Sequence, residues 1–211
     1  MTGILQEIGS NLYEGNHEMV ATLVEQALSQ GLPAGEILHD GLIAGMDEVG
    51  RDFRSGELFT PEVLITARAM HAGLDVLRPA LSRGGVPSVG RFIIGTVKGD
   101  LHDIGKNLVM MMMEGAGFEP VDLGADVTHQ AFVEAVRQYQ PHIVGMSALL
   151  TTTMPNMRST IEALEEAGLR DSVKIVVGGA PVTAQFADDI GADAYASDAA
   201  TVVEMARGLV G

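Results

Sequence analysis

The chain has 211 residues, no cysteine and a formal net charge of −15. Without cysteine it can form no disulfide framework, no thiolate metal site and no cysteine nucleophile. The acidic surplus argues against nucleic acid as a partner, because phosphate backbones bind clustered lysine and arginine. No apolar run approaches the roughly 18 residues of a membrane span, and the N-terminus lacks the regions of a secretory signal. These features predict a cytoplasmic protein with no membrane partner.

The first part of the chain has the apolar periodicity of helices. A first helix is expected over about residues 3–13, and apolar residues then recur at helical spacing from Met19 to Leu28. Two further stripes run from Leu38 to Phe53 and from Val63 to Leu81. Stretches that contain glycine and proline separate these segments. The pattern predicts a bundle of four helices joined by short loops.

The periodicity changes after the stretch "SRGGVPSVG" at residues 82–90. Beyond it, short apolar runs alternate with amphipathic stretches, as in a parallel sheet that helices cover on both faces. The expected strands are 91–97, 120–124, 142–148, 174–179 and 192–197. The fold class is therefore α + α/β. A four-helix bundle at 1–85 precedes a doubly wound, Rossmann-like domain with a five-stranded parallel sheet at 86–211.

The loops that follow the predicted strands carry the candidate functional residues, because ligands of doubly wound sheets bind at the carboxyl ends of the strands. The first loop contains an aspartate, a histidine and a glycine, the third contains hydroxyl side chains, and the fourth contains two adjacent glycines. The nucleotide fingerprints G-x-G-x-x-G and G-x-x-x-x-G-K-[ST] are absent from the expected positions. Taken alone, the D-x-H of the first loop is more often a helix cap than a metal ligand.

The three loops together form a more specific pattern. Asp100-x-His102-x-x-Gly105, then Ser147-x-Leu149, then Gly178-Gly179 resembles the cobalamin-binding signature D-x-H-x-x-G…S-x-L…G-G. The word "GDLHDIGKN" is similar to the corrinoid proteins of methyltransferase systems and to the cobalamin-binding module of methionine synthase. The stretch "GMDEVGRDFRSGELFTPEVLITARAM" resembles the helical cap of those proteins. The resemblance covers nearly the whole chain.

The resemblance implies a bound cobalamin whose own base has left the cobalt and been replaced by a protein histidine. His102 would then be the axial cobalt ligand, with Asp100 accepting a hydrogen bond from its other ring nitrogen. Thr153 would extend this chain of hydrogen bonds, at a position where methionine synthase has serine. The full set of cofactor-binding residues that the resemblance implies is Gly99, Asp100, Leu101, His102, Asp103, Gly105, Ser147, Leu149, Thr151, Thr153, Gly178, Gly179, Ala196, Phe53 and Val63.

The remaining members of this set have more specific expected roles. Ser147 and Leu149 would flank the detached cofactor tail, and Gly178-Gly179 would leave room for it. Phe53 and Val63 of the helical domain would cover the upper face of the corrin. Thr60 stands where family members often have leucine, which implies a smaller or more polar cover.

The resemblance also implies a function as a methyl carrier that is not catalytic alone. Co(I) would accept a methyl group from a substrate-specific methyltransferase, and a second methyltransferase would take it from methyl-Co(III) to tetrahydrofolate or a thiol. A corrinoid-reactivating reductase is the third implied partner. The methyl donor stays open among methylamines, methanol, methoxyaromatics and betaines. The alternatives are a B12-binding subunit of a mutase, which normally lacks this cap, and a B12-dependent sensor, which needs a basic DNA-binding region.

Overall fold

A computed structural model describes residues 2–84 and 88–210. Their contacts divide the chain into a helical unit up to Ser88, with which Gly115–Gly117 are grouped, and an α/β unit of the other residues from Val89 onward. The centre of the predicted linker, at 85–87, lies outside the described residues. No helix within the two described ranges is both long and apolar enough to cross a membrane.

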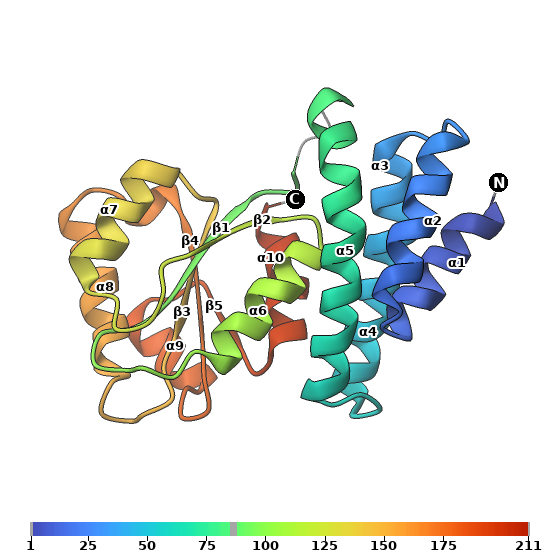
Figure 1. The fold of residues 1–211 in the computed structure, drawn as a ribbon. Helices are drawn as coiled ribbons and strands as arrows, with labels where there is room; N and C mark the ends of the chain where they lie inside the picture. The colour runs from blue at the N-terminus through green and yellow to red at the C-terminus, as the bar shows by residue number, and fades with distance from the viewer. Residues whose placement is uncertain (1, 85–87, 211) are drawn as a thin grey trace. The chain divides into compact units, whose positions relative to one another are not determined.

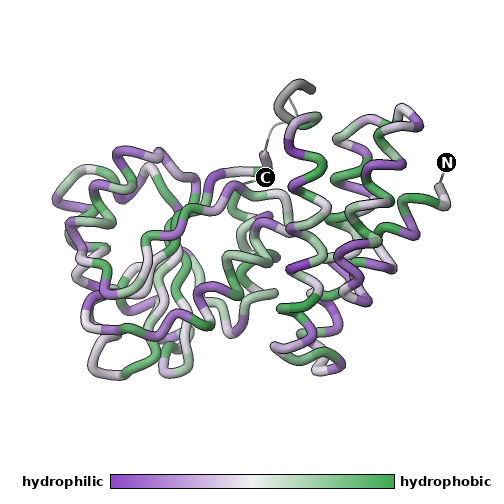
Figure 2. The backbone as a smooth tube through the Cα atoms, viewed as in Figure 1, coloured by the Kyte–Doolittle hydropathy of each residue, from purple (hydrophilic) through white to green (hydrophobic). Residues whose placement is uncertain are grey.

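The helical unit contains the four predicted helical segments (Figure 1). The first, second and fourth are α1 (Thr2–Tyr13), α2 (His17–Ser29) and α5 (Thr60–Gly84), and the third joins three elements without a break: α3 (Ala34–Glu36), η1 (Ile37–Ile43) and α4 (Ala44–Ser55). Apolar and polar stretches alternate along these helices (Figure 2). The apolar side chains form a core because they recur on one face of each helix. Among the fully buried ones are Ile8, Leu12, Val20, Val24 and Leu42.

The third segment differs from a regular helix because η1 is a π-helix. The chain there lies close to α1: a Cβ on Gly45 would come within 3.0 Å of the Gly9 Cα, and one on Gly41 within 3.3 Å of the Ile8 side chain. A π-helical turn accommodates one extra residue, so it shifts which residues face the neighbouring helix. The apolar period of four and three residues does not reveal such an insertion.

The α/β unit contains, in its described residues, one parallel sheet with the strand order β2-β1-β3-β4-β5. Its elements in chain order are β1 (Arg91–Thr96), α6 (Ile104–Gly115), β2 (Glu119–Asp122), α7 (His129–Tyr139), β3 (Ile143–Ser147), α8 (Pro155–Glu166), η2 (Arg170–Ser172), β4 (Lys174–Gly178), α9 (Ala184–Ile190), β5 (Ala194–Ala196) and α10 (Ala199–Val210). The predicted doubly wound fold is confirmed, with each strand inside its expected range or within one residue of it.

Helices cover both faces of this sheet, and Figure 1 shows α7 and α8 on one face with α6 and α10 on the other. Alternate side chains of β1 therefore enter different apolar layers. Ile93 packs in the core formed with α7, α8 and α9, whereas Phe92 and Ile94 face the layer under α6 and α10. Burial on both faces explains why the strand reads as a continuous apolar run.

The register of the strands aligns the ends that carry the candidate residues. Thr96 pairs with Ser147, Ser147 with Gly178, and Gly178 with Ala196. Four strands thus end in one row of the sheet. The loops that follow them leave from the same edge, which brings the three sequence motifs together.

Candidate functional site

Asp100 links the first and third loops of the α/β unit. Its carboxylate is fully buried, although it belongs to the loop between β1 and α6. Oδ2 accepts hydrogen bonds from the backbone amides of Leu149 at 2.7 Å and Leu150 at 3.2 Å, and from the Thr153 hydroxyl at 2.7 Å. A single carboxylate therefore organises two loops about 50 residues apart in the chain.

The other oxygen of Asp100 orients His102. Oδ1 lies 2.7 Å from Nδ1 of the imidazole and accepts the backbone amide of His102 at 3.1 Å. The Thr96 hydroxyl also donates to the backbone carbonyl of His102 at 2.9 Å. These contacts fix the backbone on both sides of the His102 Cα, while the side chain stays 52% exposed. The hydrogen bonds expected between Asp100 and both His102 and Thr153 are present.

The pKa of Asp100 is set by two opposing effects. Burial raises the pKa of the carboxyl, but the hydrogen bonds from the Leu149 amide, the Thr153 hydroxyl and His102 lower it more, so the pKa lies well below its usual range. A carboxylate oxygen only accepts hydrogen bonds, so the neutral imidazole that fits this contact carries its proton on Nδ1. The other ring nitrogen, Nε2, is left with its lone pair available for a ligand.

Exposed apolar side chains adjoin His102. Leu101 is 76% exposed and Ile104 74% exposed, and Leu149 and Leu150 on the third loop are also exposed. Large apolar side chains in one exposed region indicate a binding surface, because solvent contact with them is unfavourable. Ile104 and Leu150 were not predicted from the sequence, although each adjoins a motif residue.

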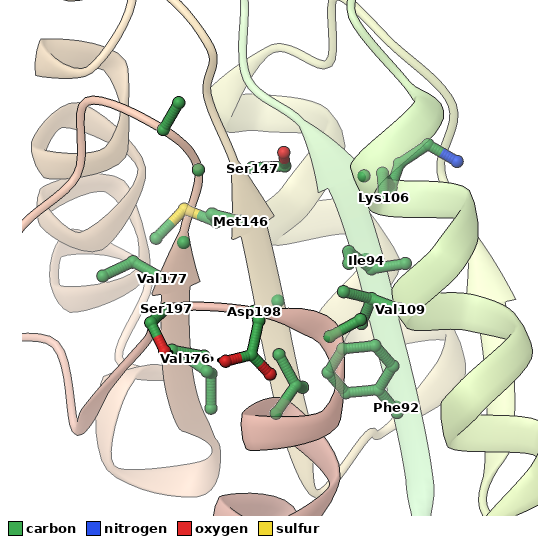
Figure 3. Close-up of a pocket in the computed structure, with 18 residues that line it drawn as sticks. Phe92, Ile94, Lys106, Val109, Met146, Ser147, Val176, Val177, Ser197 and Asp198 are labelled. Atoms are coloured by element: carbon green, nitrogen blue, oxygen red, sulfur yellow. Dashed lines mark hydrogen bonds between the residues drawn. The ribbon is translucent and has the colours of Figure 1, made fainter. Parts of the chain in front are cut away.

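A cavity of about 280 Å³ lies beneath α6 and α10, against β1, β3 and β4 (Figure 3). Five predicted residues line it: Gly105, Ser147, Gly178, Gly179 and Ala196. The rest of its wall is largely apolar, with Phe92, Met146 and Val177 among the side chains labelled in Figure 3. A Cβ placed on Gly105 would meet nothing within 4 Å, so this glycine borders open space.

Gly178, the last residue of β4, and Gly179, which follows it, both border the cavity and lie close to neighbouring backbone. A Cβ on Gly178 would lie 2.9 Å from the Ala196 carbonyl oxygen, and one on Gly179 would lie 1.9 Å from the Ala148 carbonyl oxygen. Gly179 also has a φ of 130°, which other residues rarely adopt. A Cβ on either glycine would therefore collide with the backbone of a neighbouring segment, and the role of the pair in leaving room for the cofactor tail stays a prediction.

Several predicted residues lie outside the cavity. The side chain of Leu149 is exposed, and the residue contacts Asp100 through its backbone amide, so it does not flank the cavity as Ser147 does. The chain turns after β3, and this turn directs successive amides toward Asp100. Thr151 is exposed, and Asp103 contributes its backbone carbonyl to the amide of Asn107 at 2.8 Å. Gly99 has a φ of 81° in the turn before Asp100.

The two predicted residues of the helical unit differ in burial. Phe53 is half-buried on α4, and Val63 on α5 is fully buried. The neighbouring Phe59, which was not predicted, is exposed. Phe59 precedes α5, where its backbone amide donates to the Glu62 carboxylate at 3.0 Å.

Two charged residues at the cavity were also missed. Lys106 is almost fully buried, and its ammonium group contacts Asp122 Oδ1 at 2.6 Å and Asn107 Oδ1 at 2.7 Å while its stem lines the cavity. Asp198 precedes α10 and accepts hydrogen bonds from Thr201 and Ser197. Burial raises the pKa of Asp198, but these hydrogen bonds lower it by a larger amount, so the pKa lies below its ordinary value. An aspartate before a helix is a recognisable capping signal, whereas a buried lysine has none in sequence.

These features fit a base-off corrinoid held by histidine. His102 provides an oriented imidazole with a free Nε2, and exposed apolar side chains adjoin it. The cavity begins at Gly105, three residues further along the same segment, and extends beneath α6 and α10. A flat macrocycle against the exposed side chains and a tail in the cavity would use both parts of the site.

Comparisons with known proteins agree with this geometry. The model of a B12 binding domain matches residues 90–204, and a second B12 binding domain model matches residues 4–78. Trimethylamine corrinoid protein 1 of Methanosarcina acetivorans is 45% identical over 197 residues, which cover 92% of this chain and 91% of the relative. Dimethylamine corrinoid protein of Methanosarcina barkeri is 44% identical over 208 residues, 98% of this chain and 97% of the relative.

Two solved structures are similar over almost the whole chain. A cobalamin-binding protein from Desulfitobacterium hafniense DCB-2 has a TM-score of 0.83 and 33% identity, covering 98% of each chain. A chain of the methanol:cobalamin methyltransferase complex from Methanosarcina barkeri has a TM-score of 0.87 and 28% identity, covering 98% of this chain and 79% of that one. Both resemblances extend through the helical and the α/β units.

Proposed function

Because the chain belongs to the family of corrinoid proteins with B12-binding domains, we propose that it carries a methyl group on a bound corrinoid between two methyltransferases. The observation that carries the proposal is the buried Asp100 carboxylate, which holds Nδ1 of His102 and leaves Nε2 free. An imidazole oriented in this way is the form that binds a metal ion.

The residues of the chain bind and control the cofactor. His102 would hold the cobalt of the corrinoid through Nε2, Asp100 would keep the proton on Nδ1, and Thr153 donates a hydrogen bond to Asp100. When bound, the corrinoid supplies the cobalt centre that accepts the methyl group and gives it up again. The hydrogen bond from Asp100, which Thr153 holds in place, would keep the imidazole oriented whether or not the metal is bound. The protein therefore sets the axial ligand, and the cofactor carries the methyl group.

The cavity under α6 and α10 is proposed to take the detached tail of the corrinoid. Ser147, Gly178, Gly179 and Ala196 border it, and Gly105 leaves its entrance open. The proposed role of Gly99, Leu101, Asp103, Leu149 and Thr151 is to shape the two loops beneath the corrin.

The helical domain at 1–85 is proposed to cover the upper face of the corrin, and the domain at 86–211 to bind its lower face and tail. Resemblance to the family's cap assigns Phe53 and Val63 to the cover. The half-buried ring of Phe53 keeps a surface that can contact a ligand. Val63 is fully buried within the helical unit, so its proposed role is to support the cover by packing in the core of that unit.

The proposed partners are a substrate-specific methyltransferase, a second methyltransferase that loads a C1 acceptor, and a corrinoid-reactivating reductase. The association of a similar chain with a methanol:cobalamin methyltransferase supports the first of these. Relatives named for trimethylamine and for dimethylamine are about equally similar to this chain, which favours a methylamine donor selected by the partner enzyme. A cytoplasmic location is part of the proposal.

Electron paramagnetic resonance of the Co(II) form tests the proposal, because an axial nitrogen splits its signal. We expect protein reconstituted with hydroxocobalamin to show splitting from one nitrogen, and the splitting should change when the histidines carry ¹⁵N. His102→Ala should abolish it, and ¹⁵N-imidazole added to this variant should restore the labelled pattern. His129→Ala on α7 is the matched control and should match wild type. Unchanged splitting in His102→Ala would contradict the assignment of the ligand.

A further inference from the structure

Asp126 has an unusual backbone in the loop between β2 and α7. Its φ is 55°, in the left-handed region, and Gln140 is the other non-glycine residue with positive φ in the described residues. This conformation costs about 1 kcal/mol or more for a residue other than glycine, although aspartate and asparagine tolerate it best. Such a conformation persists when surrounding contacts compensate for it.

The compensating contacts of Asp126 lie on the loop that carries His102. Its carboxylate accepts the backbone amide of Gly99 at 2.7 Å, and its own amide donates to the carbonyl of Asp100 at 3.0 Å. The left-handed backbone lets the side chain and the amide of one residue reach the same loop. The next residue, Val127, continues the connection through a parallel bridge to Val97.

The opposite side of this loop is held from α8. The side-chain amide of Asn156 donates to the carbonyl of Lys98 at 2.9 Å. The segment from Lys98 to Asp100 is thus fixed by Asp126 on one side and by Asn156 on the other. The hydrogen bonds of Asp126 go to Gly99 and Asp100 and not to His102, so its effect on His102 passes through the loop backbone.

We propose that Asp126 is a positioning residue for axial ligation: by clamping Gly99 and Asp100 it holds His102 where its Nε2 meets the cobalt. This inference rests on the proposed function and adds a residue that none of the three sequence motifs contains. Without the clamp the loop gains conformational freedom, and bringing the imidazole back to the metal costs entropy. The contacts that compensate for the strained backbone of Asp126 therefore stabilise the loop after β1, which carries His102, and not its own loop.

Two variants of Asp126 keep or remove the hydrogen bond, and a third variant controls for the relief of backbone strain. Asp126→Asn keeps an acceptor oxygen and tolerates positive φ, whereas Asp126→Gly relieves the strain and removes the acceptor. Gln140→Gly relieves the same kind of strain after α7 and is the matched control. All variants are made in the full chain.

The first measurement uses the protein without cofactor. Amide hydrogen exchange by nuclear magnetic resonance reports the Gly99 amide directly, since this amide is the donor to Asp126. We expect Asp126→Gly to accelerate Gly99 exchange by about tenfold, and Asp126→Asn and Gln140→Gly to stay close to wild type. Unchanged exchange at Gly99 in Asp126→Gly would show that the clamp does not exist in solution.

The second measurement is the Co(II)/Co(I) midpoint potential of the protein loaded with hydroxocobalamin and reduced in a spectroelectrochemical cell. Co(I) releases its axial ligand, so weaker binding of His102 to Co(II) makes the potential more positive. Loss of one charged hydrogen bond should weaken that binding about fivefold, a rise of about 40 mV for a one-electron couple. Asp126→Asn and Gln140→Gly should shift the potential by less than about a third of this amount.

The outcomes distinguish this inference from the proposed function. If Asp126→Gly frees the Gly99 amide but leaves the potential and the nitrogen splitting at wild-type values, Asp126 shapes only the loops and the inference is wrong. If the wild type shows no nitrogen splitting, the proposed function fails and the inference fails with it. A positive shift in Asp126→Gly alone, together with faster Gly99 exchange, supports the clamp.

Discussion

The Asp100 carboxylate can stay charged while buried because both of its oxygens accept hydrogen bonds. The Leu149 and Leu150 amides and the Thr153 hydroxyl approach one oxygen, and the backbone and ring of His102 approach the other. A buried carboxylate is stable only with such partners. The residue that orients the proposed ligand is therefore also a source of pH-dependent stability.

The sign of this pH dependence follows from the lowered pKa of Asp100. The unfolded chain binds a proton near pH 4 while the folded chain stays ionised, so the stabilisation is complete above that pH and is lost as pH falls toward the folded pKa. We expect Asp100→Asn to destabilise the α/β unit at pH 7, by an amount that shrinks below about pH 4. Hydrogen exchange of the β3 and β4 amides measures the difference, and a pH-independent difference would contradict the ionised state.

Substitution of Thr153 tests the hydroxyl group that donates a hydrogen bond to the Asp100 carboxylate. Thr153→Val keeps the shape but removes the hydroxyl from a buried carboxylate, which should cost about 1–3 kcal/mol of opening free energy. Thr153→Ser keeps the donor and should lose less. The control is Thr160→Val on α8, since the buried Thr160 hydroxyl donates to the Asn156 backbone carbonyl, a neutral acceptor, at 2.8 Å. An equal loss at both positions in the same exchange experiment would show that the charge of Asp100 adds nothing.

At the scale of elements, close approach of neighbouring backbone segments explains the glycine pair at the end of β4. Gly179→Ala should destabilise the sheet by about 3–5 kcal/mol, because the new Cβ overlaps the Ala148 carbonyl oxygen and φ is unfavourable. Gly168→Ala is the control: its φ of 69° is also positive, but its Cβ would meet nothing within 4 Å. That variant should lose only about 1–2 kcal/mol. Exchange at the β4 amides distinguishes them, and similar losses would assign the whole effect to φ.

The regular elements were predictable from sequence because their signal is periodic. The strand from Arg91 to Thr96 is buried after its first residue because both faces of the sheet are covered, and the stripe from Val63 to Leu81 follows one long helix. The Asp100–His102 pair was predictable because its members are two residues apart in a motif with a known chemical role.

The unpredicted features depend on contacts between distant segments. The π-helical segment of the third helix directly precedes α4, whose Gly45 lies close to Gly9 of α1. The buried Lys106 of α6 donates a hydrogen bond from its ammonium group to Asp122 at the end of β2. Asp126 reaches Gly99 across two loops, 27 residues apart. Neither spacing nor composition encodes such pairs, so they appear only when the fold is assembled.

At the scale of the whole molecule, every residue with a proposed role serves the corrinoid or the loops around it. We therefore expect the loaded and reduced protein to show no turnover of a methyl donor alone, and to become methylated when a cognate methyltransferase is added. The measurement follows the methyl-cobalt absorption band with trimethylamine, dimethylamine and methanol, each with and without its methyltransferase. The control is the methyltransferase with free cobalamin. Rapid demethylation of a donor by this chain alone would contradict the carrier role.

The hydrogen bonds between the Asp100 carboxylate and a loop far along the chain also constrain the order in which the protein folds during synthesis on the ribosome. The donors at Leu149, Leu150 and Thr153 follow Asp100 by about 50 residues, and β3 must pair with β1 before they come near. The helical unit consists of neighbouring segments with short connections and leaves the ribosome first. The imidazole of His102 thus acquires its final orientation only after the chain beyond Thr153 has emerged. A nascent chain arrested before that point should have a folded bundle but no competence to retain a corrinoid.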